Sequence, residues 1–153
     1  MAESITCQKC QVDIDGERFA AAAKVCPACG HHFPLTAHER VALLVDDGSF
    51  EEFADDLYSV DFLEFPRYAQ RLETYRERTG LPSEMVTGTA CLAGVKAVLG
   101  VTDMHFIMGS MGSVVGEKIT RCFEVGVEHG LPVIIVSGSG AGARMDEGTV
   151  ALM

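Results

Sequence analysis

Basic residues are scarce in this 153-residue sequence, which holds 12 Lys and Arg against 22 Asp and Glu and has a formal net charge of −10. Between Arg40 and Arg67 there is no basic residue at all. Because binding to a phosphate backbone depends mainly on Lys and Arg, this balance disfavours a nucleic-acid partner. The acidic stretch between the two arginines is most simply a solvated face.

The sequence also lacks a run of the roughly eighteen apolar residues that a membrane span needs. Its first four residues have neither the basic flank nor the apolar core of a secretory signal. We therefore expect a cytoplasmic protein without membrane contact, in which thiols stay reduced. Hydrophobic residues make up 48% of the chain, a share typical of a globular protein.

Four of the six cysteines form two C-x-x-C pairs separated by fifteen residues. This spacing is typical of a tetrahedral four-sulfur zinc site, which has no open position and is structural. Disulfides would suit a secreted protein, and a thioredoxin-like motif would have one pair after a strand. We therefore predict one structural Zn²⁺ per chain, with the ligands Cys7, Cys10, Cys26 and Cys29.

Residues 1–35 are accordingly predicted to form a zinc ribbon of two short strands, with Asp15-Gly16 as the turn. Residues 36–83 are predicted to form a helical connecting segment. A capping box of Thr36 and Glu39 begins its first helix. The other helix signals are a stop at Gly48, a second start at Ser49, and a helix over 67–79 that ends at Gly80.

Residues 84–153 have a different pattern, in the order of a ββα unit. It predicts strands over 85–92 and 95–102, a helix over about 114–129, a strand over 133–136 buried on both faces, and a last helix from about 144. The sequence ends inside that last helix, so we expect the second domain to be cut short.

A glycine-rich loop over 137–144 joins the buried strand to the last helix. Backbone N–H groups at such a place are unpaired and can bind a phosphate or an oxyanion. The loop lacks the Gly-Lys-Ser/Thr of a P-loop and does not follow the strand order of a dinucleotide-binding fold. Taken alone, its glycines could equally serve close packing.

Several segments together resemble the bacterial acetyl-CoA carboxylase carboxyltransferase β subunits. They are the cysteine pairs with CPACGHHF at 26–33, GSMGSVVGEK at 109–118 and GARMDEG at 142–148. The resemblance covers essentially all of this chain, but about the first half of a typical family member.

The resemblance implies a zinc ribbon followed by the first part of a crotonase-like α/β domain. It implies transfer of CO₂ from carboxybiotin to acetyl-CoA, giving malonyl-CoA for fatty-acid biosynthesis. The implied partners are a carboxyltransferase α subunit in an α2β2 assembly and the biotin carboxyl carrier protein, in an ATP-binding carboxylase system. We expect the 153-residue form to be inactive alone.

The resemblance also implies the site residues. Where the family usually reads Ser-Gly-Gly-Ala-Arg, residues 139–144 carry one extra small residue, so the candidates for the oxyanion-binding amides are Gly140, Ala141 and Gly142. Arg144 either orients a carbonyl or carboxylate, or anchors the loop by a salt bridge. The predicted substrate-binding residues are Gly109, Ser110, Met111 and Gly112, and Met108 stands where the family often has glycine.

Two other functions remain open from the sequence. Zinc ribbons also occur as nucleic-acid or protein-binding modules, although the net charge disfavours nucleic acid. The same fold could also serve a carboxyltransferase or a decarboxylase that acts on another acyl-CoA.

Overall fold

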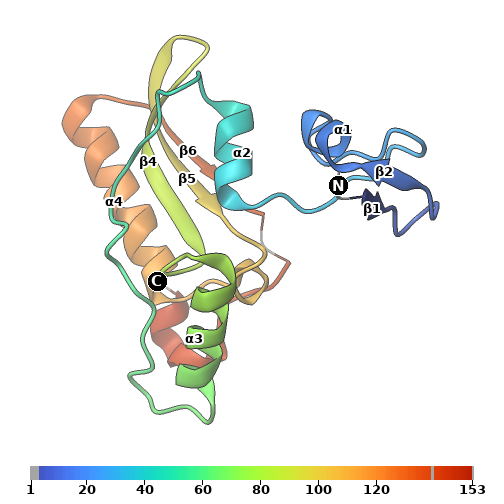
Figure 1. Ribbon diagram of the computed structural model, residues 1–153. Coiled ribbons are helices and arrows are strands. Elements are labelled where there is room, and N and C mark those ends of the chain that lie inside the picture. The colour runs from blue at the N-terminus through green and yellow to red at the C-terminus, as the bar shows by residue number, and fades with distance from the viewer. Residues whose placement is uncertain (1–3, 139, 153) are drawn as a thin grey trace. The chain divides into compact units, whose positions relative to one another are not determined.

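The computed structural model describes residues 4–138 and 140–152, with side chains as far as Gly148. It divides into two compact units, residues 1–35 and 36–153, both drawn in Figure 1. Helices and strands occur together in each unit, in agreement with the predicted α/β class. Ser139, the first residue of the predicted oxyanion segment, lies outside the described residues.

The first unit is built from two short strands and one short helix. Strands β1 (Ser4–Thr6) and β2 (Asp13–Asp15) pair antiparallel on either side of the first cysteine pair, and α1 (Gly16–Ala21) follows. The predicted turn at Asp15-Gly16 is wrong. Aspartate is a good helix N-cap, and the Asp15 carboxylate accepts a hydrogen bond from the Arg18 backbone N–H at 3.0 Å, so a helix begins there instead.

The second unit contains a four-stranded sheet. The strands are β3 (Glu51–Glu52), β4 (Met85–Leu92), β5 (Val95–Thr102) and β6 (Val133–Val136), in that spatial order. The predicted hairpin of β4 and β5 is confirmed in its bounds, and β6 lies parallel to β5. The helix start predicted at Ser49 is wrong, because its hydroxyl hydrogen-bonds to the backbone of Cys91 and the chain continues as β3.

The helices of this unit follow the predictions more closely. They are α2 (Ala37–Leu44), α3 (Tyr68–Thr79) and α4 (Ser113–His129). The capping box of Thr36 and Glu39 is present, and Gly80 closes α3 in a left-handed conformation. Two 3₁₀ segments complete the described part, η1 (Ile107–Gly109) and η2 (Met145–Leu152), and η2 stands in place of the predicted final α-helix.

Successive residues of the central strands face opposite sides of the sheet. Figure 1 shows α2 and α4 on opposite sides of β4 and β5. Leu99 and Val101 belong to the buried cluster that includes Val41 of α2. Gly100, between them, faces α4, where a Cβ at this position would lie 3.5 Å from Cys122 Sγ.

The buried face of α4 contains an unexpected charge. Its buried residues at intervals of four are Val114, Lys118, Cys122 and Gly126. Lys118 is almost inaccessible to solvent, and its Nζ donates to the Met85 carbonyl at 2.7 Å. Burial lowers the pKa of this lysine. Lys118 therefore ties α4 to the start of β4.

Strand β6 is less buried than its apolar sequence predicts. Ile134 is 37% exposed, and the other three residues are half-buried. Within the described residues, β6 pairs with β5 alone and forms an edge of the sheet. Burial on both faces is therefore not observed, since a strand at an edge is covered less completely than a central one. No helix in the described part of the chain is long and apolar enough to span a bilayer.

Replacing Gly126 with alanine should lower the free energy of unfolding by about 1–2 kcal/mol, although alanine favours helix. A Cβ at this position would lie 2.4 Å from Val133 Cγ2, and the branched valine cannot turn away. Chemical denaturation measures the change. Glu128→Ala, on the exposed side of the same helix, is the control and should stay within about 0.5 kcal/mol of the wild type. A Gly126→Ala protein as stable as the control would contradict this account of the packing.

Candidate functional site

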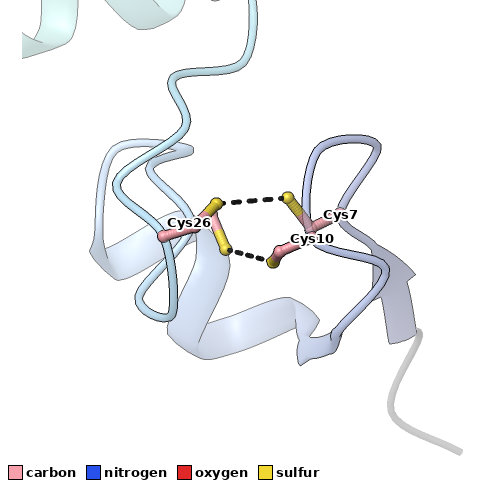
Figure 2. Close-up of side chains that lie close together, drawn as sticks. Cys7, Cys10 and Cys26 are labelled. Atoms are coloured by element: carbon pink, nitrogen blue, oxygen red, sulfur yellow. Dashed lines mark hydrogen bonds between the residues drawn. The ribbon is translucent and has the colours of Figure 1, made fainter.

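The four cysteines of the first unit lie close together. Their Sγ atoms are all within 4.8 Å of one another. The Sγ atoms of Cys7 and Cys29 are 3.8 Å apart, and those of Cys10 and Cys26 are 3.7 Å apart (Figure 2). A tetrahedral ion with metal–sulfur bonds of about 2.3 Å has sulfur–sulfur edges of about 3.8 Å. The cluster therefore has the geometry of a four-sulfur metal site.

Two thiols of the cluster differ in acidity. Backbone N–H groups of Cys10 and Lys9 help to lower the pKa of the Cys7 thiol to about 6. Burial and the neighbouring sulfurs raise the pKa of Cys29 to about 12. Because the thiolate is the metal-binding form, a cation among the sulfurs would be needed to keep Cys29 deprotonated near neutral pH.

In the second unit, the two glycine-containing loops predicted to form the site lie side by side. Met111 and Ala143 form a parallel β-bridge between them. The Met111 N–H donates to the Gly142 carbonyl at 3.1 Å, and the Arg144 N–H donates to the Met111 carbonyl at 2.8 Å. The structure therefore brings together the segments 108–112 and 140–144, which are about thirty residues apart in the sequence.

The three candidate amides differ in their surroundings. The Gly140 N–H donates to the Met108 carbonyl at 3.1 Å, so this amide is already used to hold the loops together. Gly142 is exposed, and a Cβ there would meet no atom within 4 Å, so a ligand could approach its backbone closely. Ala141 is half-buried between them.

The start of the 108–112 loop and the residue before it are held in an unusual conformation. Ile107 and Met108 have φ values of 42° and 56°, in the left-handed region that L-residues disfavour by about 1–2 kcal/mol each. The Ile107 side chain is buried in the core, whereas that of Met108 is 57% exposed. This turn directs the Met108 carbonyl toward Gly140, so backbone strain is located at the contact between the two loops.

Arg144 lies beneath the loops, and only 1% of its side chain is exposed. It forms ion pairs with Glu84 and Glu147, the second at 3.2 Å. It also donates from Nη1 to the Tyr68 hydroxyl at 2.5 Å, from Nε to Ser110 Oγ at 3.1 Å and from Nη2 to the Ser110 carbonyl at 3.0 Å. This environment supports the anchoring alternative for Arg144.

The charge of Arg144 is retained in this buried place. Burial alone would lower the pKa of Arg144, but Glu84 and Tyr68 together outweigh this effect, and the pKa is raised. Burial, followed by the hydrogen bond to Glu147, raises the pKa of Tyr68, so the phenol stays protonated and can donate to that carboxylate. The group is therefore a cation held between two carboxylates and a phenol.

The same two carboxylates cover the N-terminus of α4. Glu84 accepts from the Gly112 N–H at 3.1 Å, and Glu147 accepts from the Ser113 N–H at 2.6 Å. Of the predicted substrate-binding residues, Gly109, Ser110 and Gly112 are buried, and Met111 is exposed. An anionic ligand at this helix end would therefore have to compete with two protein carboxylates.

Sequence reasoning missed Glu84, Tyr68 and Glu147 as part of this site. Glu147 lies three residues after Arg144, a spacing at which side chains in a helical turn can meet. No local pattern marks Glu84 or Tyr68, which lie sixty and seventy-six residues before Arg144. Their role depends on the packing of α3 and β4 against the loops.

Comparison with known proteins identifies the family of the chain. Residues 34–153 match the model of the carboxyl transferase domain. The chain belongs to the carboxyl transferase family. Over all 153 residues, the chain is 48% identical to the acetyl-coenzyme A carboxylase carboxyl transferase subunit beta of Syntrophomonas wolfei subsp. wolfei. It covers 54% of that protein and so spans about half the length of this relative.

Solved structures of a transcarboxylase and of a malonate decarboxylase share the fold. A transcarboxylase 12S structure with methylmalonyl-coenzyme A and methylmalonic acid bound has a TM-score of 0.61 and 25% identity, over 78% of this chain and 21% of that one. The Pseudomonas malonate decarboxylase MdcD-MdcE hetero-dimer has a TM-score of 0.53 and 28% identity, over 77% of this chain and 42% of that one. The crotonase-like fold expected from the resemblance is confirmed.

Removal of metal should unfold the first unit. Apart from two of its cysteines, the buried core of this unit is Ile14 and Phe19, too few apolar residues to fold without a metal. We expect about one metal ion per chain under reducing conditions and its loss in Cys26→Ser, measured by elemental analysis. Proteolysis after chelation should then cut within residues 4–35. Cys91→Ser, outside the cluster, is the control, and an equal loss of metal in that variant would contradict the assignment.

Replacing Gly112 with alanine should displace the buried ion pair. A Cβ at this position would lie 2.9 Å from both Arg144 Nη2 and Glu84 Oε1. We expect a loss of about 2–4 kcal/mol in the free energy of unfolding, measured by chemical denaturation. Gly142→Ala, where the Cβ would meet nothing within 4 Å, is the matched control and should change stability by less than about 0.5 kcal/mol. Equal stabilities of the two variants would show that the pair does not require a glycine there.

Proposed function

We propose that this chain is the β component of an acetyl-CoA carboxyltransferase, which moves CO₂ from carboxybiotin to acetyl-CoA and forms malonyl-CoA. The observation that carries the proposal is the pairing of the loops 108–112 and 140–144 over the buried Arg144. This pairing occurs in a chain 48% identical to an acetyl-CoA carboxylase subunit beta.

The chemistry needs stabilisation of an enolate more than it needs a protein nucleophile. When carboxybiotin releases CO₂, the biotin anion can accept a methyl proton from acetyl-CoA, and the resulting enolate carbon forms the new bond to CO₂. The negative charge develops on the thioester oxygen, where backbone N–H groups are effective donors. A site built from loop amides is therefore consistent with this reaction.

The surroundings of the three candidate amides indicate which of them can donate to the enolate oxygen. Since the Gly140 N–H is bonded to the Met108 carbonyl, we favour Gly142 over Gly140 as a donor to the enolate oxygen, and Ala141 stays a candidate from the family resemblance. The open backbone at Gly142 supports its choice as the principal donor. Arg144 would act by holding these amides in place, and Met111 would be the part of the second loop that meets substrate.

The remaining assignments follow from the same family. We propose zinc as the ion of the four cysteines, an α subunit in an α2β2 assembly, a biotin carboxyl carrier protein as donor, and a cytoplasmic location. We also propose three functional parts: a ribbon over 1–35, a helical segment over 36–83 and a carboxyltransferase part over 84–153. The 153 residues would be inactive without further chain or subunits.

A second candidate keeps the fold and changes the acyl group. The likeness to a transcarboxylase with bound methylmalonyl-coenzyme A and to a malonate decarboxylase supports it. Competition between acetyl-CoA and larger acyl-CoA thioesters in one assay distinguishes the two. A nucleic-acid-binding ribbon is the third possibility, and salt-dependent DNA binding by residues 1–35 would support it.

Joining residues 1–153 to the second half of the Syntrophomonas wolfei subunit should give a chimera that makes malonyl-CoA. The assay supplies the α subunit and the carboxybiotinyl carrier protein, and the intact S. wolfei subunit is the positive control. A folded, metal-loaded chimera that makes no product while the control does would reject the proposed function.

Within an active chimera, Arg144→Ala should lower transfer by more than about tenfold, or ~1.4 kcal/mol in the activation free energy, because the loop amides lose their anchor. Steady-state kinetics with acetyl-CoA measure the change. Arg121→Ala, on the exposed face of α4, is the control. An unchanged rate in Arg144→Ala would show that the arginine has no part in catalysis.

A further inference from the structure

The side chain of Glu84 is completely buried and connects three separate segments. One oxygen forms the ion pair with Arg144 and accepts from the Gly112 N–H at 3.1 Å. The other accepts from Ser59 Oγ at 3.3 Å. A single carboxylate therefore joins the 140–144 loop, the start of α4 and the segment before α3.

Glu84 is itself held at a rigid place. Its carbonyl accepts from the Asp103 N–H at 2.8 Å, directly after β5. The next carbonyl, that of Met85, accepts from Lys118 Nζ of α4 at 2.7 Å. One anchor directly follows β5 and the other lies in α4, so movement of Glu84 requires movement of the end of β5 or of α4.

The backbone at Gly112 is shaped to admit the pair. Its φ of −110° is available to any residue, so its conformation does not require glycine. A side chain is excluded by the ion pair itself, since a Cβ would lie 2.9 Å from Glu84 Oε1 and 3.0 Å from Arg144 Cζ. The pair therefore packs directly against the loop backbone.

We propose that Glu84 is a positioning residue which, through Arg144, fixes the Gly140–Ala143 loop against the 108–112 loop. The Arg144 backbone N–H holds the Met111 carbonyl while its guanidinium holds Glu84, so the end of the loop is fixed at two points. A role in catalysis rests on the proposed carboxyltransferase function. The role of Glu84 in fixing the loop does not depend on that function.

The test separates positioning from stability by a double-mutant cycle on the purified chain. Arg144→Met leaves two carboxylates buried without their cation and should lower the denaturation midpoint strongly. Glu84→Gln keeps an acceptor for the Gly112 N–H and removes one charge. In Glu84→Gln/Arg144→Met, we expect the midpoint to recover toward the wild type, because one uncompensated charge has been removed.

Hydrogen exchange of the amides at residues 140–143 is the decisive measurement. We expect exchange on the order of tenfold faster in the double variant than in the wild type, even where its midpoint has recovered. The matched control is Glu117→Gln/Arg121→Met, which removes an exposed ion pair of 2.8 Å on α4 and should leave these amides unchanged. Wild-type exchange at 140–143 in a stable Glu84→Gln/Arg144→Met protein would overturn the proposal.

Steady-state kinetics of the chimera, assayed with the α subunit and the carboxybiotinyl carrier protein, complete the test. In the double variant, kcat should fall more than about tenfold while KM for acetyl-CoA changes little, as expected for a loss confined to the transition state. Hydrogen exchange at residues 140–143 could be faster in the double variant while the chimera with the wild-type residues transfers no carboxyl group. In that case the proposed function fails and the positioning role stands. If the wild type is active and the double variant retains its kcat, the positioning role in catalysis is rejected.

Discussion

Taking a guanidinium out of water is unfavourable unless other groups replace its hydration, and this constraint organises the second unit. The guanidinium of Arg144 forms ion pairs with two carboxylates and hydrogen bonds with a phenol and with the hydroxyl and carbonyl of Ser110, and these replace its hydration. These partners come from the residue before β4, from η2, from α3 and from the 108–112 loop. Each must be in place for the others to be satisfied, so the glycine loop has a defined position on the sheet.

Different interactions stabilise the two units. The second buries apolar side chains on both faces of β4 and β5, with α2 on one side and α4 on the other. The first has few buried apolar residues, and its four sulfurs have the spacing of a tetrahedral metal site. Metal binding is thus expected to contribute most of the folding free energy of the first unit and little to that of the second.

The buried network also limits which groups are available for chemistry. The amides at the start of α4 are bonded to Glu84 and Glu147, and that of Gly140 is bonded to Met108. Gly142, next to the pair formed by Met111 and Ala143, is exposed. A loop that presents few amides in a fixed direction is suited to one oxyanion, since preorganised donors need no rearrangement during reaction.

Local chemistry determined much of this protein from sequence alone. The cysteine spacing located the cysteine cluster, the capping box located α2, and two β-rich runs located the hairpin of β4 and β5, because each signal involves neighbouring residues. The predictions of a helix start at Ser49 and of a turn at Asp15 were wrong, since a serine hydroxyl or an aspartate carboxylate can bond to several backbone groups. Only the tertiary structure decided that Glu84, Tyr68 and Arg144 meet, because a buried ion pair between distant segments depends on how whole elements pack.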